Sequence, residues 1–204
     1  MPKYWYLWAL IIILIPITAY VCYKAAVASR QARLEREKTI EELNNAKSLK
    51  DEFSGISASD LEKADDGRVL SGIALLIDLK LRKEIKPKDA FEKLSENKQL
   101  AYTLNCILED TNGTVSAFFK RNTAPVSPLA SKALKAAELD ELALLFGEVY
   151  SMYDEDNEDV SLDDEKIKAA DEKFGRLFDK DLFISSAARF IKDNASDFTG
   201  GELL

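Results

Sequence analysis

The densest group of residues that could do chemistry is a run of carboxylates in the C-terminal third of the sequence. Eight acidic residues fall within the run DEDNEDVSLDDE: Asp154, Glu155, Asp156, Glu158, Asp159, Asp163, Asp164 and Glu165. Asp154, Asp156 and Glu165 occupy positions 1, 3 and 12 of a calcium-binding loop, whose ligands are carboxylate oxygens at such spacing. Position 6 is Asp159, where such a loop needs glycine for its sharp turn. We therefore expect no metal site in this run.

Two other interpretations of the acidic run remain open. The first is a solvated connection between two helices, in which Ser161 or Asp163 caps the second helix. The second is an acidic surface that attracts a basic partner protein. Residues 138–204 carry 19 acidic and 7 basic side chains, a net charge of −12 in a chain whose total charge is −8. Because phosphates need positive charge, we expect no direct binding of nucleic acid here.

The remaining sequence offers few groups for catalysis. It has no histidine, and its two cysteines are Cys22 and Cys106. Nucleophilic systems that pair serine or cysteine with histidine therefore cannot be assembled, and zinc sites usually draw on cysteine and histidine. The sequence contains no glycine-rich phosphate-binding motif. We expect a protein that is not an enzyme, has no cofactor and forms no disulfide.

Apolar spacing predicts helices in most of the chain beyond residue 24. The most apolar of these segments is 68–85, a predicted core helix that ends before Pro87. Segment 131–153 is strongly helical, and segment 164–194 predicts one or two final helices. No segment alternates apolar and polar residues as a strand would, so we expect an all-α fold. The predicted buried stripe of 131–153 is Leu134, Ala137, Leu142, Leu145 and Phe146.

The first 23 residues predict a membrane anchor. Residues 4–23 include no charged residue, and a helix of that length spans about 30 Å, the thickness of a hydrocarbon core. The aromatic side chains that favour the membrane interface lie at its two ends: Tyr4, Trp5 and Trp8, then Tyr20 and Tyr23. A cleaved signal peptide and a buried helix are the alternatives, but the apolar segment is longer than the about 7–15 residues of a signal peptide. We expect a retained transmembrane helix at 4–23.

Charges on either side of this segment predict its orientation. Lys3 precedes it, whereas five basic residues follow it: Lys24, Arg30, Arg33, Arg36 and Lys38. Positive residues stay in the cytoplasm, so we expect a single-pass protein of the inner (cytoplasmic) membrane, with its N-terminus outside and its C-terminal domain in the cytoplasm.

Between the anchor and the domain we expect a helical stalk at residues 24–57. A short coiled-coil homodimer is the alternative, but the stalk lacks four clean heptads. The break SGISASD at 54–60, with Ser59 or Asp60 as a helix cap, leads into an all-helical domain at 58–204.

Part of that domain resembles a known family. The features that carry the resemblance are a turn, an aromatic pair, a helix, an Asp-x-x-Phe segment and an aromatic-Ile helix end: Asn112-Gly113, Phe118-Phe119, Ala133-Leu134, Asp171 with Phe174, and Phe190-Ile191 with Phe198. In this order, over about residues 98–198, they resemble the small bacterial helical domains grouped with a DNA-mimic protein. Thr114, Val115 and Ala117 depart from that family's pattern, which has glycine, an aromatic residue and glutamine there.

The resemblance implies a protein-binding role, because the characterised member imitates the charge of DNA and occupies a helix-turn-helix repressor. Carried to this chain, the acidic residues after Glu138 would bind a basic protein such as a DNA-binding regulator. The residues themselves favour structural roles for the motif, since Gly113 tolerates positive φ in a turn and Phe118 and Phe119 suit a core.

The leading hypothesis is therefore a membrane-anchored, non-enzymatic domain that binds a basic partner through its acidic C-terminal third. The alternative is an immunity-type or structural membrane protein that acts through hydrophobic contacts. Neutralising residues 154–165 would leave the function of such a protein intact.

Overall fold

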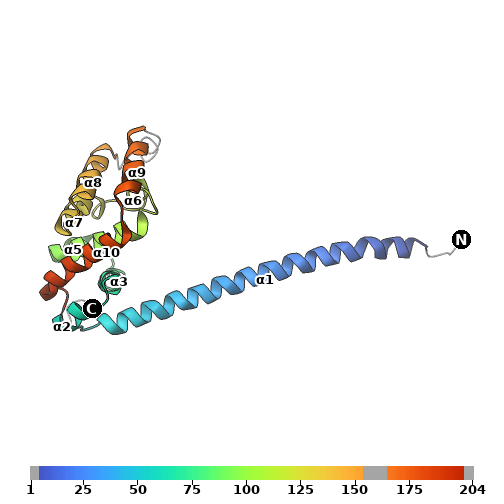
Figure 1. The fold of residues 1–204 in the computed structure, drawn as a ribbon. Coiled ribbons are helices and arrows are strands. Elements are labelled where there is room, and N and C mark those ends of the chain that lie inside the picture. Colours follow the sequence, from blue (N-terminus) through green and yellow to red (C-terminus); the bar gives the residue numbers. More distant parts are fainter. Residues whose placement is uncertain (1–4, 154–164, 200–204) are drawn as a thin grey trace. The chain divides into compact units, whose positions relative to one another are not determined.

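The computed structural model describes residues 5–153 and 165–199, and within these ranges every regular element is a helix (Figure 1). The predicted all-α class is confirmed for the part of the chain described. The chain divides into two compact units, residues 1–47 and 48–204.

Helix α1, Trp5–Phe53, is unbroken over 49 residues. Its residues up to Lys47 form the described part of the first unit, and its last turns belong to the second unit. Across the residues that the structure describes, no helix combines the length and the apolar character that a membrane crossing requires. Of the aromatic residues predicted at the membrane interface, Tyr4 lies outside the described residues, as do the side chains of Trp5 and Trp8. Tyr20 and Tyr23 are described and exposed, and the Lys24 ammonium lies 5.9 Å from the centre of the Tyr20 ring.

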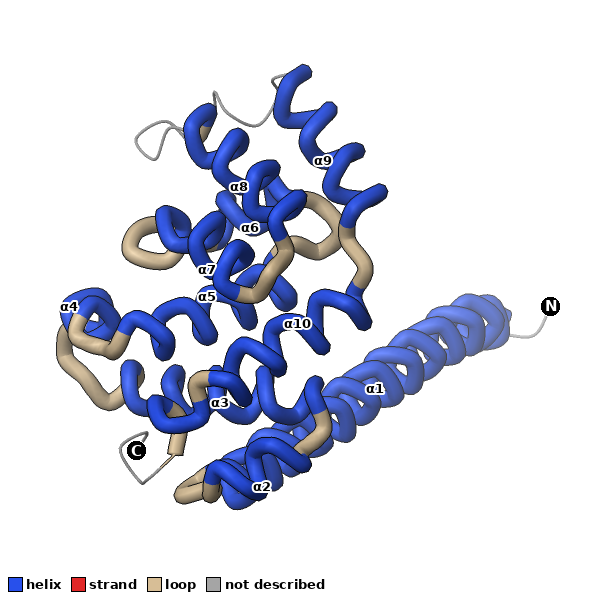
Figure 2. The backbone as a smooth tube through the Cα atoms, turned by 60° about the vertical axis from the view of Figure 1, so that its left-hand side comes forward, coloured by secondary structure: helices blue, strands red, loops and turns tan. Residues whose placement is uncertain are grey.

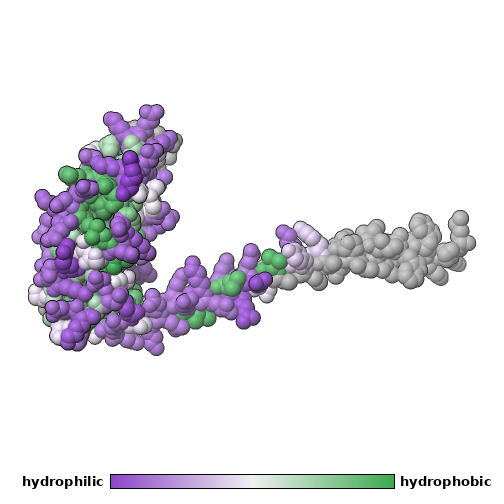
Figure 3. Space-filling view, in the orientation of Figure 1, coloured by the Kyte–Doolittle hydropathy of each residue, from purple (hydrophilic) through white to green (hydrophobic). Residues whose placement is uncertain are grey.

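Exposed apolar side chains on the stalk do not share one face of α1. Figure 3 shows isolated apolar groups among hydrophilic ones along this segment, and Val27, Leu34, Ile40 and Leu43 are the large exposed ones. At about 100° per residue, Leu34 lies about 20° from Val27 around the helix, whereas Ile40 lies about 120° from Leu34. A coiled coil needs one continuous apolar seam, so this arrangement favours the plain stalk over the dimer.

The second unit contains the end of α1 and the remaining helices of the described ranges. Helix α5 is central, because it contacts α3, α6, α7 and α10 (Figure 2). Helix α8 packs against both α7 and α9, which places α9 beside the end of α8. The helices are α2 (Ala58–Lys63), α3 (Asp66–Leu81), α4 (Pro87–Glu92), α5 (Glu96–Asp110), α6 (Val115–Arg121), α7 (Ala130–Ala136), α8 (Asp140–Met152), α9 (Glu165–Leu177) and α10 (Lys180–Asp193), with 3-10 turns at Ser127–Leu129 and Ala195–Asp197.

The last turns of α1 belong to the core of the second unit rather than to the stalk. Leu49 and Phe53 are four residues apart, so they share a helix face, and both are buried. The Phe53 ring lies against Gly72 of α3. Nearby, the Arg68 guanidinium donates to the carboxylate of Glu52 and to the Ser48 hydroxyl. The compact unit accordingly begins at residue 48, ten residues before the predicted boundary.

Two predicted helix ends differ from the structure. Ser57 is the N-cap of α2, and its hydroxyl accepts a hydrogen bond from the Asp60 amide at 3.2 Å, whereas the predicted caps Ser59 and Asp60 lie inside the helix. Helix α3 ends at Leu81 instead of residue 85. Leu81 is its last buried position, and Pro87 then starts α4, where its missing amide hydrogen costs nothing.

The segment 131–153, predicted to be strongly helical, forms two helices, α7 and α8, and its predicted buried stripe is confirmed. Helix α7 ends before Glu138, which has φ of +59°. The Leu139 amide donates to the Leu134 carbonyl at 2.9 Å, the bond that commonly closes a helix through a left-handed residue. Glycine usually marks that position, and glutamate gives no such signal. The reversal lets α7 and α8 bury their apolar faces against each other.

Candidate functional site

The structure leaves most of the predicted acidic run undescribed. Seven of its eight carboxylates fall within 154–164, outside the described residues, together with the proposed caps Ser161 and Asp163. Glu165, the eighth, is the exposed first residue of α9. The geometry of a calcium loop or a helix cap in this run therefore stays untested.

Helix α8, which leads into that run, presents an acidic face of its own. Asp140, Leu144 and Glu148 are spaced four residues apart, which sets each about 40° from the next around the helix, and Glu141 lies beside them. The three carboxylates are exposed, and Leu144 in their midst is 67% exposed. We call these four residues the α8 acidic face. A carboxylate-rimmed apolar side chain suits contact with a partner that carries both positive charge and apolar surface.

A groove of about 440 Å³ runs between α8 and α9 where the acidic run leaves one helix and enters the other. Its apolar lining includes Leu145, Met152 and Ala170. The Lys173 ammonium on one wall lies 3.8 Å from the carboxylate of Glu148 on the other. The groove is thus contiguous with the α8 acidic face through Glu148.

The family-like turn and aromatic pair have structural positions. Asn112 and Gly113 connect α5 to α6 with φ of +47° and +89°, a geometry that asparagine and glycine adopt most easily. Phe118 and Phe119 are buried, with ring centres 5.1 Å apart. Phe118 also contacts Phe146 at 5.4 Å, so the pair joins α6 to α8 in the core. The phenylalanine pair therefore holds the fold together and presents no surface to a ligand, whereas Asn112 and Gly113 are exposed in the turn.

Asp171 on α9 has a role that spacing alone did not predict. Its carboxylate accepts hydrogen bonds from the amide of Ser116 at 2.9 Å and from the Ser116 hydroxyl at 2.6 Å. Ser116 lies in the first turn of α6, where amide hydrogens have no partner within the helix. Asp171 therefore caps α6 from another helix and connects α6 to α9.

Cys106 on α5 is the described side chain with the most intrinsic nucleophilicity, but its surroundings suppress it. Burial raises the pKa of the Cys106 thiol to about 12, and the negative charge of Asp110 adds to the effect. Burial also raises the pKa of its neighbour Tyr102 well above the ordinary value. Only the thiolate attacks, so Cys106 is unreactive at neutral pH. No group of three histidine, cysteine, aspartate or glutamate side chains in the described part could hold a metal ion.

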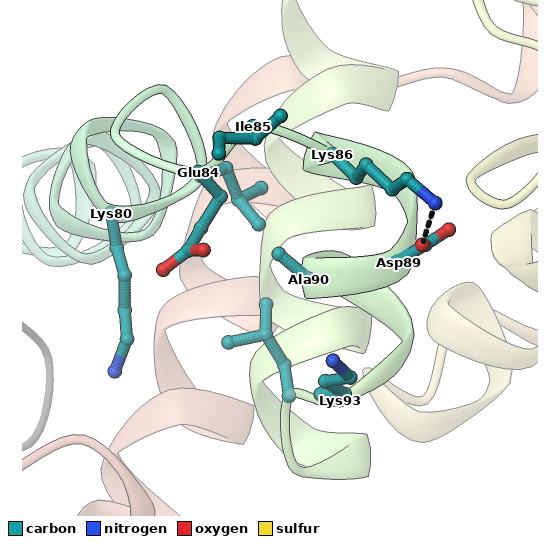
Figure 4. Close-up of a pocket in the computed structure, with 9 residues that line it drawn as sticks. Lys80, Glu84, Ile85, Lys86, Asp89, Ala90 and Lys93 are labelled. Carbon is teal, nitrogen blue, oxygen red and sulfur yellow. Dashed lines mark ion pairs between the residues drawn. The ribbon is translucent and has the colours of Figure 1, made fainter.

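A second groove, which the sequence did not predict, lies where α3 turns into α4 (Figure 4). It measures about 560 Å³, and Leu81, Ala90 and Leu94 provide its apolar lining. Charged side chains surround it, and Ile85 lies at its rim with 98% of its surface exposed. The signal that was overlooked is the cationic segment KLRKEIKPK at 80–88, in which one isoleucine is surrounded by lysines and arginine. The charged lining residues are Lys80, Glu84, Lys86, Asp89 and Lys93.

Comparisons with known proteins identify no relative of this chain. No protein-family model, no curated protein and no solved structure matches it. The similarity to DNA-mimic domains consequently stays a prediction made from the residues named above.

Proposed function

We propose that this chain is a membrane-anchored, non-enzymatic protein whose acidic C-terminal third binds a basic partner protein. The observation that carries the proposal is the α8 acidic face, three exposed carboxylates around Leu144. In the sequence, α8 is followed by the carboxylates of 154–165, within a region of net charge −12. A DNA-binding regulator is one class of partner with the required charge.

The uncharged segment at 4–23 supports the membrane part of the proposal, since its length and interfacial aromatics match a bilayer. The cationic residues that follow it support a cytoplasmic C-terminal domain. A reducing cytoplasm also suits Cys106, whose thiol is free.

Electrostatics would dominate such binding. Exposed carboxylates interact weakly one by one, but several of the same sign create a field that speeds association with a cation-rich surface. Salt screens this field over about 8 Å at physiological ionic strength. Leu144 would add an apolar contact at the centre of the interface, where side chains lose most water.

Affinity purification of the tagged full chain from detergent extract, followed by mass spectrometry, tests the proposal. We expect a basic partner whose recovery falls steeply with salt. The variant Asp140→Asn/Glu141→Gln/Glu148→Gln should lose that partner, on the order of tenfold for about 1.4 kcal/mol of lost attraction. The matched control Glu35→Gln/Glu41→Gln/Asp51→Asn removes three exposed carboxylates elsewhere and should retain it. The proposal is contradicted if recovery of the partner does not change with salt concentration, or if both variants lose the partner equally.

The alternative, an immunity-type or structural membrane protein that acts through hydrophobic contacts, has one observation in its favour. Leu144 is exposed, and the α8–α9 groove beside it has an apolar lining. Under this alternative, Leu144→Ser should abolish partner recovery, and neutralising 154–165 should leave it unchanged. Under the leading proposal, the charge variants have the larger effect.

A further inference from the structure

We propose that the α3–α4 connection is a second membrane contact, in which Ile85 inserts into the surface of a bilayer rich in anionic lipids and the surrounding cations bind the headgroups. This inference rests on the proposed membrane location and assigns a role to residues 80–93 that the anchor does not fulfil.

The first observation is the exposure of Ile85. Its side chain is 98% exposed, compared with 67% for Leu144 and 57% for Leu182, the other strongly exposed aliphatic residues described in the second unit. Ile85 belongs to the short connection between Leu81, where α3 ends, and Pro87, where α4 begins. An isoleucine held this far from the core gains nothing from folding, and its whole side chain is available to another apolar phase. A single exposed isoleucine does not by itself indicate such a contact, so the inference depends on the charges around it.

The second observation is the charge around Ile85. Residues 80–93 include six basic and three acidic side chains, a net charge of +3 within a chain of net charge −8. The Arg82 guanidinium pairs with Asp78 at 2.7 Å, and the Lys86 ammonium lies 3.7 Å from the Asp89 carboxylate (Figure 4). Lys83, Lys88 and Lys93 are also exposed. Anionic headgroups attract such clusters, and long lysine side chains can reach them while an apolar neighbour enters the hydrocarbon boundary.

A lipid surface fits these features better than a partner protein does. A stable protein interface buries about 800 Å² on each side, with several apolar anchors at its centre. Here one apolar side chain projects from a loop, and the adjoining groove has an apolar floor between charged walls. The surface of an anionic bilayer matches that combination, because Ile85 can enter the hydrocarbon boundary while the lysines contact the headgroups.

The charge distribution of the second unit agrees with this assignment. The α8 acidic face lies on a helix other than α3 and α4, and Figure 2 shows α4 at the side of the unit, apart from α8 and α9. An anionic bilayer would attract the α3–α4 end and repel the acidic end. The acidic end would then remain accessible to the basic partner.

Hydrogen exchange of the full chain in nanodiscs tests the inference. One set of discs contains phosphatidylcholine alone, and the other contains phosphatidylcholine mixed with phosphatidylglycerol, at no more than one chain per disc. We expect the amides of residues 82–90 to exchange on the order of tenfold more slowly in the anionic discs only. Ile85→Ser, a change at a fully exposed position, should remove this protection. Leu182→Ser, at another exposed leucine of the second unit, is the matched control and should leave it intact.

The outcomes separate this inference from the proposed anchor. Co-elution of the chain with both kinds of disc, without protection of 82–90, overturns the inference and leaves the anchor standing. If the chain co-elutes with neither kind of disc, both this inference and the proposed anchor are overturned. If the chain co-elutes with the anionic discs alone, and the Ile85→Ser variant does not, the anchor is overturned and the contact through the α3–α4 connection is supported. Equal protection in both kinds of disc, or protection that requires two chains per disc, overturns the anionic-lipid assignment.

Discussion

At the scale of single residues, Gly72 shows how space excludes a side chain inside a regular helix. A Cβ atom added there would lie 2.4 Å from Cδ2 of Phe53. Phe53 is completely buried, so its ring cannot move aside without disturbing the core. Glycine in a helix interior normally costs about 1 kcal/mol relative to alanine. At this position the close approach of α1 and α3 outweighs that cost.

We therefore expect Gly72→Ala to lower the free energy of unfolding by about 1–3 kcal/mol, the usual effect of overpacking a core. Gly175 in α9 provides the control, because a Cβ added there meets no atom within 4 Å. Gly175→Ala should raise the free energy of unfolding by up to about 1 kcal/mol through helix propensity. Urea unfolding followed by circular dichroism measures both. Equal shifts in the same direction would show that space around Gly72 does not matter.

Cys106 makes stability depend on pH above neutrality. In the unfolded chain its thiol loses a proton near pH 8.5, whereas in the folded protein burial raises the pKa to about 12. The contribution of the neutral thiol to the free energy of unfolding is thus fully present below about pH 8.5, and it is lost as the pH rises toward 12. The raised pKa of Tyr102 likewise makes the free energy of unfolding fall as the pH rises, but at higher pH than for Cys106.

We expect the free energy of unfolding to fall between about pH 9 and 11, by at most about 1.4 kcal/mol per pH unit for each group. Cys106→Ala should reduce this slope, and Cys22→Ala should preserve it. Urea titrations at a series of pH values measure the slope. Identical slopes in the wild type and in Cys106→Ala would mean that the thiol is not buried as described.

At the scale of elements, α6 depends on a neighbour for its N-terminal cap. The helix has only seven residues, too few to be stable by itself. Thr114 caps it locally, through a hydrogen bond from the Ala117 amide at 3.4 Å, while Asp171 of α9 accepts two shorter bonds from Ser116. The position of α6 is therefore coupled to that of α9, and through Phe118 to the core.

Asp171→Ala should lower the free energy of unfolding by about 1–3 kcal/mol, because it leaves the Ser116 amide without its acceptor. The neighbouring Glu172 is exposed, and Glu172→Ala should change stability by less than about 0.5 kcal/mol. A double-mutant cycle with Ser116→Ala measures the coupling. Additive effects of Asp171→Ala and Ser116→Ala would argue against a direct cap.

At the scale of the whole molecule, charge is segregated along the chain. The segment at 24–38 and the α3–α4 connection are cationic, while the region from Glu138 onward carries a net charge of −12. Cations attract anionic lipid, and the acidic region attracts a basic partner. The two proposed interactions therefore use different parts of the chain and need not compete.

The proposed topology has a direct test in membrane vesicles. With a C-terminal epitope on the full chain, protease should remove the epitope from inside-out vesicles and leave it intact in spheroplasts, because the proposed orientation places the C-terminal domain in the cytoplasm. Removal of the epitope from intact spheroplasts would place the domain outside, and a mature N-terminus near Ser29 would indicate a cleaved signal peptide.

Local spacing was sufficient to predict the helical class, the buried stripe of α7 and α8, and the turn at Asn112-Gly113. Each of these follows from interactions within a few residues: helical periodicity puts Leu142, Leu145 and Phe146 on one face, and glycine tolerates positive φ. Because spacing reports only such local interactions, it gave no sign of the chain reversal at Glu138. That reversal depends on the packing of α7 against α8, and no glycine marks it.

Tertiary structure alone decided which exposed residues are available for function. The sequence shows Ile85, Leu49 and Phe53 as similar apolar side chains, yet Ile85 is exposed whereas Leu49 and Phe53 are buried. Burial depends on contacts between segments far apart in the chain, such as Phe53 against Gly72, and these contacts leave no local pattern. The charge of the C-terminal third was evident from composition alone, because charge adds up without regard to the fold.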